Sequence, residues 1–187
     1  MSARPMPRRC LGLGLAAAAV PILLILLAAT LSEWFDLFRN ALSDLGHATR
    51  SAVAPLFNLG LSAGGLLLAL SGVLCAYRRS RLIGVSLAVS GFLLILVGVF
   101  DEVYGRLHYY VSVAFFLSLA VLLVEYSVVV KCRLRRVLSL LALAVGVLSW
   151  LLHMVYGVPR GAAVPEFVSI LVSLPFYLDF LASVDRT

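Results

Sequence analysis

Charged and amide side chains are scarce in this sequence. Only 13% of the 187 residues are charged, Asn occurs twice and Gln is absent. A water-soluble domain has about a quarter charged residues and about half apolar ones, whereas 63% of this chain is hydrophobic. So little polar surface excludes an ordinary cytosolic enzyme and a disordered chain. A mean hydropathy of +1.08 indicates instead a single domain embedded in a membrane.

Cysteine and the common metal motifs are equally sparse. Cys10, Cys75 and Cys132 form no CxxC pair and no Cys/His metal spacing. This excludes a disulfide-rich secreted scaffold, and we expect three small buried or interfacial thiols. The formal net charge is +6, but the basic residues lie in short connectors between apolar runs. That distribution favours membrane orientation over nucleic-acid binding.

The long apolar runs predict an all-α bundle of six transmembrane helices. A helix that crosses the hydrocarbon layer needs about 20 apolar residues. Six windows meet this requirement: 10–31, 56–77, 82–100, 107–130, 137–156 and 164–184. We expect the first to be a retained helix, because its apolar run is longer than that of a typical signal peptide, the alternative.

The basic residues predict that both termini are cytoplasmic and that the protein lies in the plasma membrane. Eleven of the fifteen Lys and Arg residues fall on the side of the termini. These eleven are Arg4, Arg8, Arg9, Arg78, Arg79, Arg81, Lys131, Arg133, Arg135, Arg136 and Arg186. Short cytoplasmic loops carry such an excess, so the remaining four mark the outer side.

Two local patterns predict further helix features. In the first outer connector, Ser32 can cap a short amphipathic helix that Gly46 ends, with apolar residues at helical spacing. These apolar residues are Trp34, Phe38, Ala41, Leu42 and Leu45. Gly60 and Gly64 form a GxxxG pattern, which predicts close helix packing and leaves dimerisation, and hence a homo-oligomer, as an alternative.

Polar residues gather on the outer side in this topology and predict a pocket there. Ionisable groups near a membrane are costly, so they tend to face a bundle interior or a water-filled cavity. Five segments supply candidate pocket-lining residues: Ser43, Asp44, Asn58, Glu102, His108, Ser112, His153 and Glu166. On the inner side, Glu125 and Asp179 are expected to pair with basic loop residues such as Arg78, Arg79 or Arg135. A proton pathway is the alternative for these two acids.

Several of these stretches resemble a known family. The run Asn40–Gly46, the run Ala54–Leu61, the pair Asp101-Glu102 and the run Leu107–Ser112 are similar to the prokaryotic membrane family called domain of unknown function 998. The resemblance extends over about residues 25–180 and implies a six-helix bundle without a particular activity. It also implies that five polar residues belong to recurring motifs: Ser43, Asp44, Asn58, Glu102 and His108.

The residues leave three functions open, and whether the protein is an enzyme stays undecided. The first is an outward-facing pocket that binds or passes a small solute, an ion or a lipid headgroup. The second is an intramembrane lipid hydrolase, in which His47, His108 and His153 hold zinc with Asp44 or Glu102. Alternatively, His108 activates Ser43 or Ser112. The third is an electron carrier with haem between His108 and His153. The first needs no cofactor, and no HxxxH or HExxH motif supports a metal.

Overall fold

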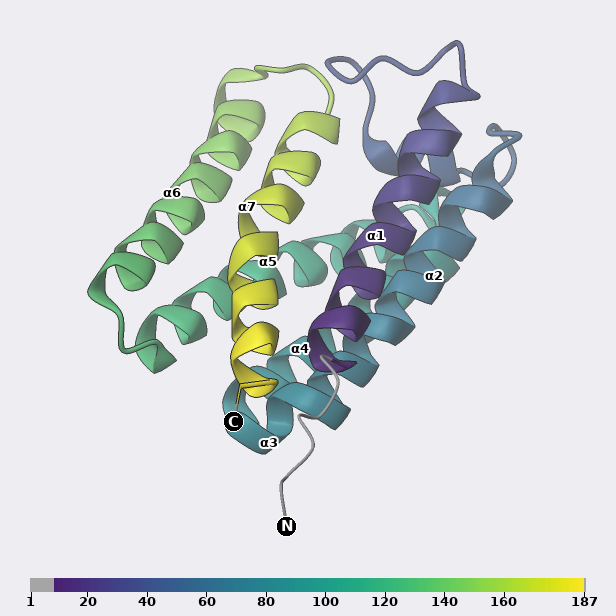
Figure 1. The fold of residues 1–187 in the computed structure, drawn as a ribbon. Coiled ribbons are helices and arrows are strands. Elements are labelled where there is room, and N and C mark those ends of the chain that lie inside the picture. Colours follow the sequence, from purple (N-terminus) through teal and green to yellow (C-terminus); the bar gives the residue numbers. More distant parts are fainter. Residues whose placement is uncertain (1–8, 187) are drawn as a thin grey trace.

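The computed structural model describes residues 9–186 as six long helices joined by short connectors (Figure 1). The helices are α1 (Arg9–Thr30), α2 (Ala54–Ser71), α4 (Arg81–Val99), α5 (Arg106–Val129), α6 (Arg133–Tyr156) and α7 (Ala163–Val184). A π-helical turn (Gly72–Ala76) and α3 (Tyr77–Arg79) extend α2. Six helices are therefore long and apolar enough to cross a membrane, as predicted. Together they give a multi-pass membrane protein.

The helices form a closed ring with one peripheral member. Going round the ring, α1 packs on α2, α2 on α4, α4 on α5, α5 on α7 and α7 on α1. Helix α6 packs outside this ring against α5 and α7 (Figure 1). The start of α1 and the end of α7 meet, because Asp185 accepts hydrogen bonds from the backbone N–H groups of Cys10 and Leu11 at 3.2 and 2.9 Å.

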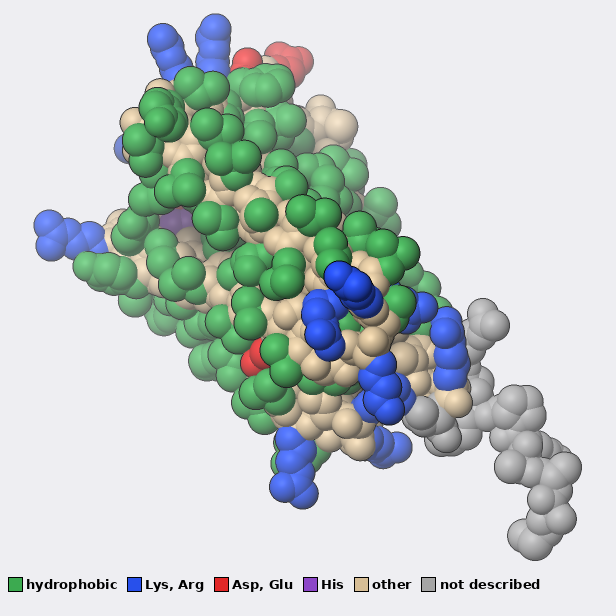
Figure 2. Space-filling view, turned by 90° about the vertical axis from the view of Figure 1, so that its left-hand side faces the viewer, with side chains coloured by type: hydrophobic (Ala, Val, Ile, Leu, Met, Phe, Trp, Pro, Cys, Tyr) green, Lys and Arg blue, Asp and Glu red, His purple; other side chains and the backbone are tan. Residues whose placement is uncertain are grey.

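The described basic residues support only part of the predicted topology, in which Lys and Arg are concentrated on the side of the termini. The space-filling view shows several Lys and Arg side chains gathered at the end of the bundle where α1 begins (Figure 2). We call this end, where α1 begins and α7 finishes, the basic end, and the opposite end the acidic end. Arg4 and Arg8, which contribute to the predicted orientation, lie outside the described residues. The cytoplasmic placement of the termini stays a prediction.

Glycine lets α2 approach both of its neighbours closely. A Cβ atom on Gly60 would stand 2.8 Å from Cβ of Leu24, and one on Gly64 would stand 2.6 Å from Pro21 Cγ in α1. The GxxxG pattern therefore serves helix packing inside the chain, as predicted. On the other face of α2, a Cβ on Gly65 would stand 2.5 Å from the carbonyl oxygen of Gly91 in α4.

The first connector at the acidic end does not form the predicted amphipathic helix. It contains turns and a short 3-10 helix, η1 (Leu42–Gly46). Asp36 and Asn40 fold the chain back on itself: Asp36 Oδ1 accepts from Phe38 N at 2.8 Å, and Asn40 Oδ1 accepts from Asp36 N at 2.9 Å. Short polar side chains that bond the local backbone compete with helix formation. Leu45 is fully buried in the bundle, whereas Phe38 is 64% exposed.

The cysteines at the basic end also differ from the prediction. Cys10 in α1 and Cys75 in the π-helical turn form a disulfide, with their Cα atoms 5.7 Å apart. Only Cys132 is a free and exposed thiol. The prediction of three thiols was wrong because 65 residues separate the pair, and only the packing of α1 on α2 brings them together.

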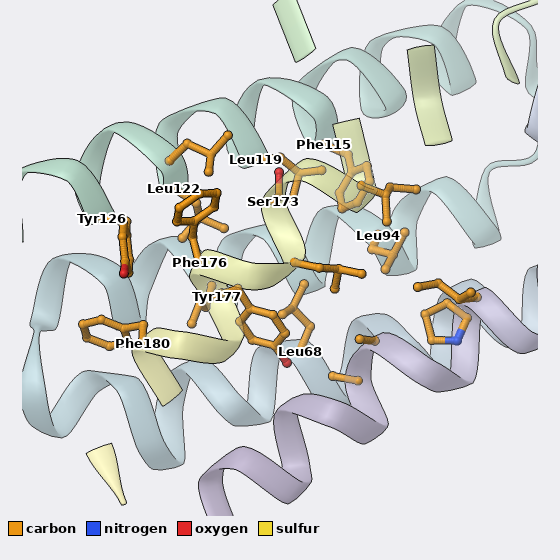
Figure 3. Close-up of a pocket in the computed structure, with 18 of the residues that line it drawn as sticks. Leu68, Leu94, Phe115, Leu119, Leu122, Tyr126, Ser173, Phe176, Tyr177 and Phe180 are labelled. Carbon is orange, nitrogen blue, oxygen red and sulfur yellow. The ribbon is translucent and has the colours of Figure 1, made fainter. Parts of the chain in front are cut away.

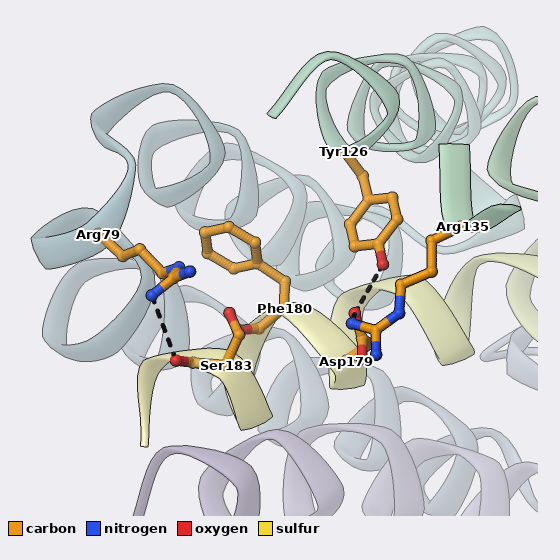
Figure 4. A network of polar contacts seen from close by, with 6 residues as sticks. All are labelled: Arg79, Tyr126, Arg135, Asp179, Phe180 and Ser183. Carbon is orange, nitrogen blue, oxygen red and sulfur yellow. Dashed lines mark hydrogen bonds and ion pairs between the residues drawn. The ribbon is translucent and has the colours of Figure 1, made fainter. Parts of the chain in front are cut away.

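The inner acids have two different environments. Asp179 pairs with Arg135 at 2.9 Å, as predicted, and accepts a 2.6 Å hydrogen bond from the Tyr126 hydroxyl (Figure 4). Glu125 accepts a 2.7 Å hydrogen bond from Ser86 instead. Within residues 9–186 the Arg135–Asp179 contact is the one ion pair, so Glu125 has no basic partner there.

Candidate functional site

Three carboxylates from separate elements meet the same loop at the acidic end. Asp44 belongs to η1, Glu102 begins the short 3-10 helix η3 (Glu102–Tyr104), and Glu166 lies in the first turn of α7. The connectors that follow α1, α4 and α6 all emerge at this end, because successive helices run in opposite directions (Figure 1). We call these three side chains the acidic cluster.

Each carboxylate of the acidic cluster binds the segment 40–43. The Oδ2 atom of Asp44 accepts 2.9 Å hydrogen bonds from the side-chain amide of Asn40 and from the backbone N–H of Ala41. This arrangement caps the start of η1 with the helix's own third residue.

The other two carboxylates hold η1 from outside the loop. Glu166 Oε2 accepts a 2.6 Å hydrogen bond from the backbone N–H of Leu42, and Ser43 Oγ donates to Glu102 Oε1 at 2.7 Å. Both contacts join residues far apart in the sequence. Ser43 and Glu166 are buried. Four predicted residues, from η1, η3 and α7, are thus brought together.

The cluster carries an excess of negative charge. Burial raises the pKa of the Glu102 carboxyl above its ordinary value of 4.5, and the charge of Asp44 raises it further. The hydrogen bond from Ser43 and the attraction of His108 oppose this shift. Asp44 and Glu102 also lie close enough to Glu166 to repel its charge. No ion pair with Lys or Arg reaches the cluster in the part of the chain that is described.

His108 lies beside the cluster in a defined orientation. Its Nδ1 atom is 2.7 Å from the carbonyl oxygen of Phe100, which can only accept, so Nδ1 carries the proton. The Nε2 atom lies 3.3 Å from Ser112 Oγ, one turn along α5, and accepts from that hydroxyl when the ring is neutral. His108 is buried, and Ser112 is half-buried.

Asn58 fixes the end of η1 to α2. Its side-chain amide donates a 2.9 Å hydrogen bond to the Gly46 carbonyl, and its buried Oδ1 has no partner among the described residues. A Cβ on Gly46 would stand 2.6 Å from that Oδ1 atom, so glycine is needed for this approach. The residue thus supports the predicted site by placing the loop.

The other two histidines have separate partners. His153 in α6 donates from Nδ1 to the Pro159 carbonyl at 2.8 Å, and His47 lies 3.3 Å from the Thr49 hydroxyl. No group of three or more His, Cys, Asp or Glu residues is arranged to hold a metal ion within residues 9–186. The geometry thus gives no support to a zinc site shared by His47, His108 and His153, whereas haem between His108 and His153 stays a prediction.

Sequence reasoning missed a cavity inside the bundle. The cavity is lined by five helices, has a volume of about 100 Å³ and includes none of the eight predicted pocket-lining residues. Its lining is almost entirely apolar. Apolar residues surround most of each helix in the sequence, so hydrophobic periodicity alone does not separate a cavity wall from a lipid-facing surface.

Comparison with known proteins gives one match. No similarity to a curated protein or to a solved structure was found. Residues 15–178 match the family described as "Protein of unknown function (DUF998)". This range holds the acidic cluster, His108 and all six helices in whole or in large part, and it agrees with the resemblance seen in the motifs. The chain therefore belongs to the DUF998 family of membrane proteins.

Proposed function

We propose that this DUF998 protein binds a small positively charged ligand at the acidic cluster, on the outer face of the plasma membrane. The ligand is a cationic organic solute or the amine of a lipid headgroup. The observation that carries this proposal is the meeting of Asp44, Glu102 and Glu166 without a basic partner among the described residues.

The hydrogen bonds of the cluster support this assignment. They use one oxygen of each carboxylate: Oδ2 of Asp44, Oε1 of Glu102 and Oε2 of Glu166. The charge of Asp44 acts unfavourably on Glu102, and both act unfavourably on Glu166, so a cation placed among the three carboxylates would relieve this repulsion.

The proposal also depends on which side the cluster faces. The excess of basic residues in the connectors opposite the cluster favours a cytoplasmic basic end and thus an outward-facing acidic end. The ligand would then arrive from outside the cell or from the outer leaflet of the bilayer.

Thermal unfolding of the purified protein in lipid nanodiscs tests this function. Choline and ethanolamine are added separately, with Mg²⁺ and Ca²⁺ as inorganic comparisons and sulfate as an anionic one. We expect at least one organic cation to raise the unfolding temperature, and Glu102→Gln and Asp44→Asn to reduce that shift. Glu33→Gln is the matched control, because Glu33 is an exposed acid at the same end. Equal shifts in all variants, or none with either organic cation, would contradict the proposal.

One observation favours a second candidate, an acyl hydrolase. The Ser112–His108–Phe100 chain of contacts has the order of a nucleophile, a general base and an acceptor that orients the base. Ser112 Oγ would attack an ester carbonyl while His108 Nε2 takes its proton; the C–O bond to the alcohol would break as His108 protonates the alcohol, and water would then hydrolyse the acyl-serine. A fluorophosphonate probe should label the wild type and not Ser112→Ala. Ser118→Ala, one and a half turns away with its hydroxyl on the Phe115 carbonyl, is the control. Absence of labelling rules this function out.

A further inference from the structure

The cavity inside the bundle extends along the helices within the membrane-spanning part (Figure 3). Leu94 and Phe115 lie at one end of it, and Tyr126 and Phe180 at the other (Figure 3). From Phe115 to Tyr126 on α5, a rise of 1.5 Å per residue gives a length of about 16 Å. This is about half the 30 Å thickness of a bilayer's hydrocarbon core, which is the depth of one leaflet.

We infer that the cavity opens to the surface between α1 and α7. Its lining residues Ala18 and Ile22 in α1 and Leu174 in α7 are half-buried, whereas Leu87 in α4 and Leu119 in α5 are buried. The two helices touch nearer the basic end and separate towards the acidic end (Figure 1). The opening therefore faces the hydrocarbon of the bilayer and not water.

The few polar atoms along the cavity already have partners. The Tyr177 hydroxyl donates to the Gly14 carbonyl at 2.8 Å, and the Ser173 hydroxyl donates to the Ser169 carbonyl at 2.7 Å. The Tyr126 hydroxyl is bound to Asp179. The cavity thus offers no free hydrogen-bonding group to a polar ligand, and an apolar space of this kind does not retain water.

We propose that this cavity binds the acyl chain of a single membrane lipid, which enters sideways between α1 and α7. The length of one leaflet, the lateral opening and the satisfied polar atoms all fit a hydrocarbon chain. A volume of about 100 Å³ holds part of such a chain, with the rest in the open side of the groove. This site is separate from the acidic cluster and does not depend on the function proposed for it.

Photo-crosslinking in nanodiscs tests the proposal. One phospholipid carries a diazirine in its acyl chain, a second carries it on the headgroup, and labelled residues are mapped by mass spectrometry. We expect the chain probe to label Leu87 and Leu119, which are 1% and 8% exposed and which bulk lipid reaches only through the cavity. The headgroup probe should not label them. Labelling of these residues by neither probe, or by the headgroup probe, would overturn the assignment.

A blocked entrance provides the matched comparison. Ala18→Phe places an aromatic ring at the mouth and should reduce labelling of the buried positions at least fivefold. Ala144→Phe makes the same change at an exposed position of α6, which is not part of the cavity, and should leave labelling unchanged. If Ala18→Phe does not fold, Leu174→Trp blocks the other side of the mouth. Undiminished labelling in a folded blocked variant would refute entry between α1 and α7.

Discussion

Substitution of Gly65 by alanine tests the close approach of α2 and α4. The added Cβ would stand 2.5 Å from the carbonyl oxygen of Gly91 and 2.9 Å from the backbone nitrogen of Ile95. Ordinary contact begins at 3.4 Å, so the first of these distances is short by about 0.9 Å. Neither neighbour is a flexible side chain, because both atoms belong to the backbone of α4. The two helices must therefore separate or tilt.

The expected cost follows from this geometry. Overpacking of a well-packed interface costs about 1–3 kcal/mol, and a backbone clash belongs at the upper end of that range. Alanine in place of glycine returns up to about 1 kcal/mol through its higher helix propensity. Gly65→Ala should therefore lower the free energy of unfolding by about 2 kcal/mol.

Titration with dodecyl sulfate in mixed micelles, followed by circular dichroism, measures this quantity. Gly12→Ala is the control, because a Cβ on Gly12 in α1 meets no atom within 4 Å. The control should unfold like the wild type or be slightly more stable. Our reasoning fails if Gly65→Ala is as stable as Gly12→Ala, since the helices would then have room for a methyl group at that position.

Three further predictions follow from single contacts. Because the native pKa of Glu102 is raised, the folded protein binds its proton more tightly than the unfolded chain does, and stability falls as pH rises from 4.5 through the raised pKa. In ligand-free buffer, Glu102→Gln should thus gain unfolding temperature relative to the wild type over that interval; a constant difference would contradict the shift. Ser43→Ala should lose about 1–2 kcal/mol of stability in the same titration, whereas Ser51→Ala, whose buried hydroxyl has no partner among the described residues, should lose less. Maleimide should label the unreduced, denatured protein once, at Cys132, and three times after reduction; three labels without reductant would show that the disulfide is absent.

The sequence predicted which polar residues lie at the acidic end, but it did not predict which of their atoms are in contact. Successive spans run in opposite directions, so the connectors and helix ends that carry Ser43, Asp44, Glu102 and Glu166 all lie at one end of the bundle. Which atoms touch depends on how the 40–46 segment folds over the bundle. The helical spacing of Trp34 and Phe38 with the following leucines predicted an amphipathic helix there. Bonds from Asp36 and Asn40 to the nearby backbone, and burial of Leu42 and Leu45, gave η1 instead.

Glycine spacing was a signal that sequence reasoning left unused. Gly65 and Gly72 are seven residues apart in one predicted helix, and Gly84 and Gly91 are seven apart in the next. A repeat of seven keeps residues close to one face of a helix. Paired repeats in neighbouring helices thus indicate the α2–α4 contact, whereas the GxxxG pattern concerns only α1 and α2.

The sequence by itself determined the six helices and the ends at which their polar residues lie. In a bilayer each backbone group needs an internal partner, so an apolar run of sufficient length must be helical. Tertiary structure alone decided the disulfide, the folding of η1 onto three carboxylates and the cavity that five helices line. These features depend on which helices are neighbours and how closely they approach. The apolar residues of a helix do not by themselves show which of its faces meets which neighbour.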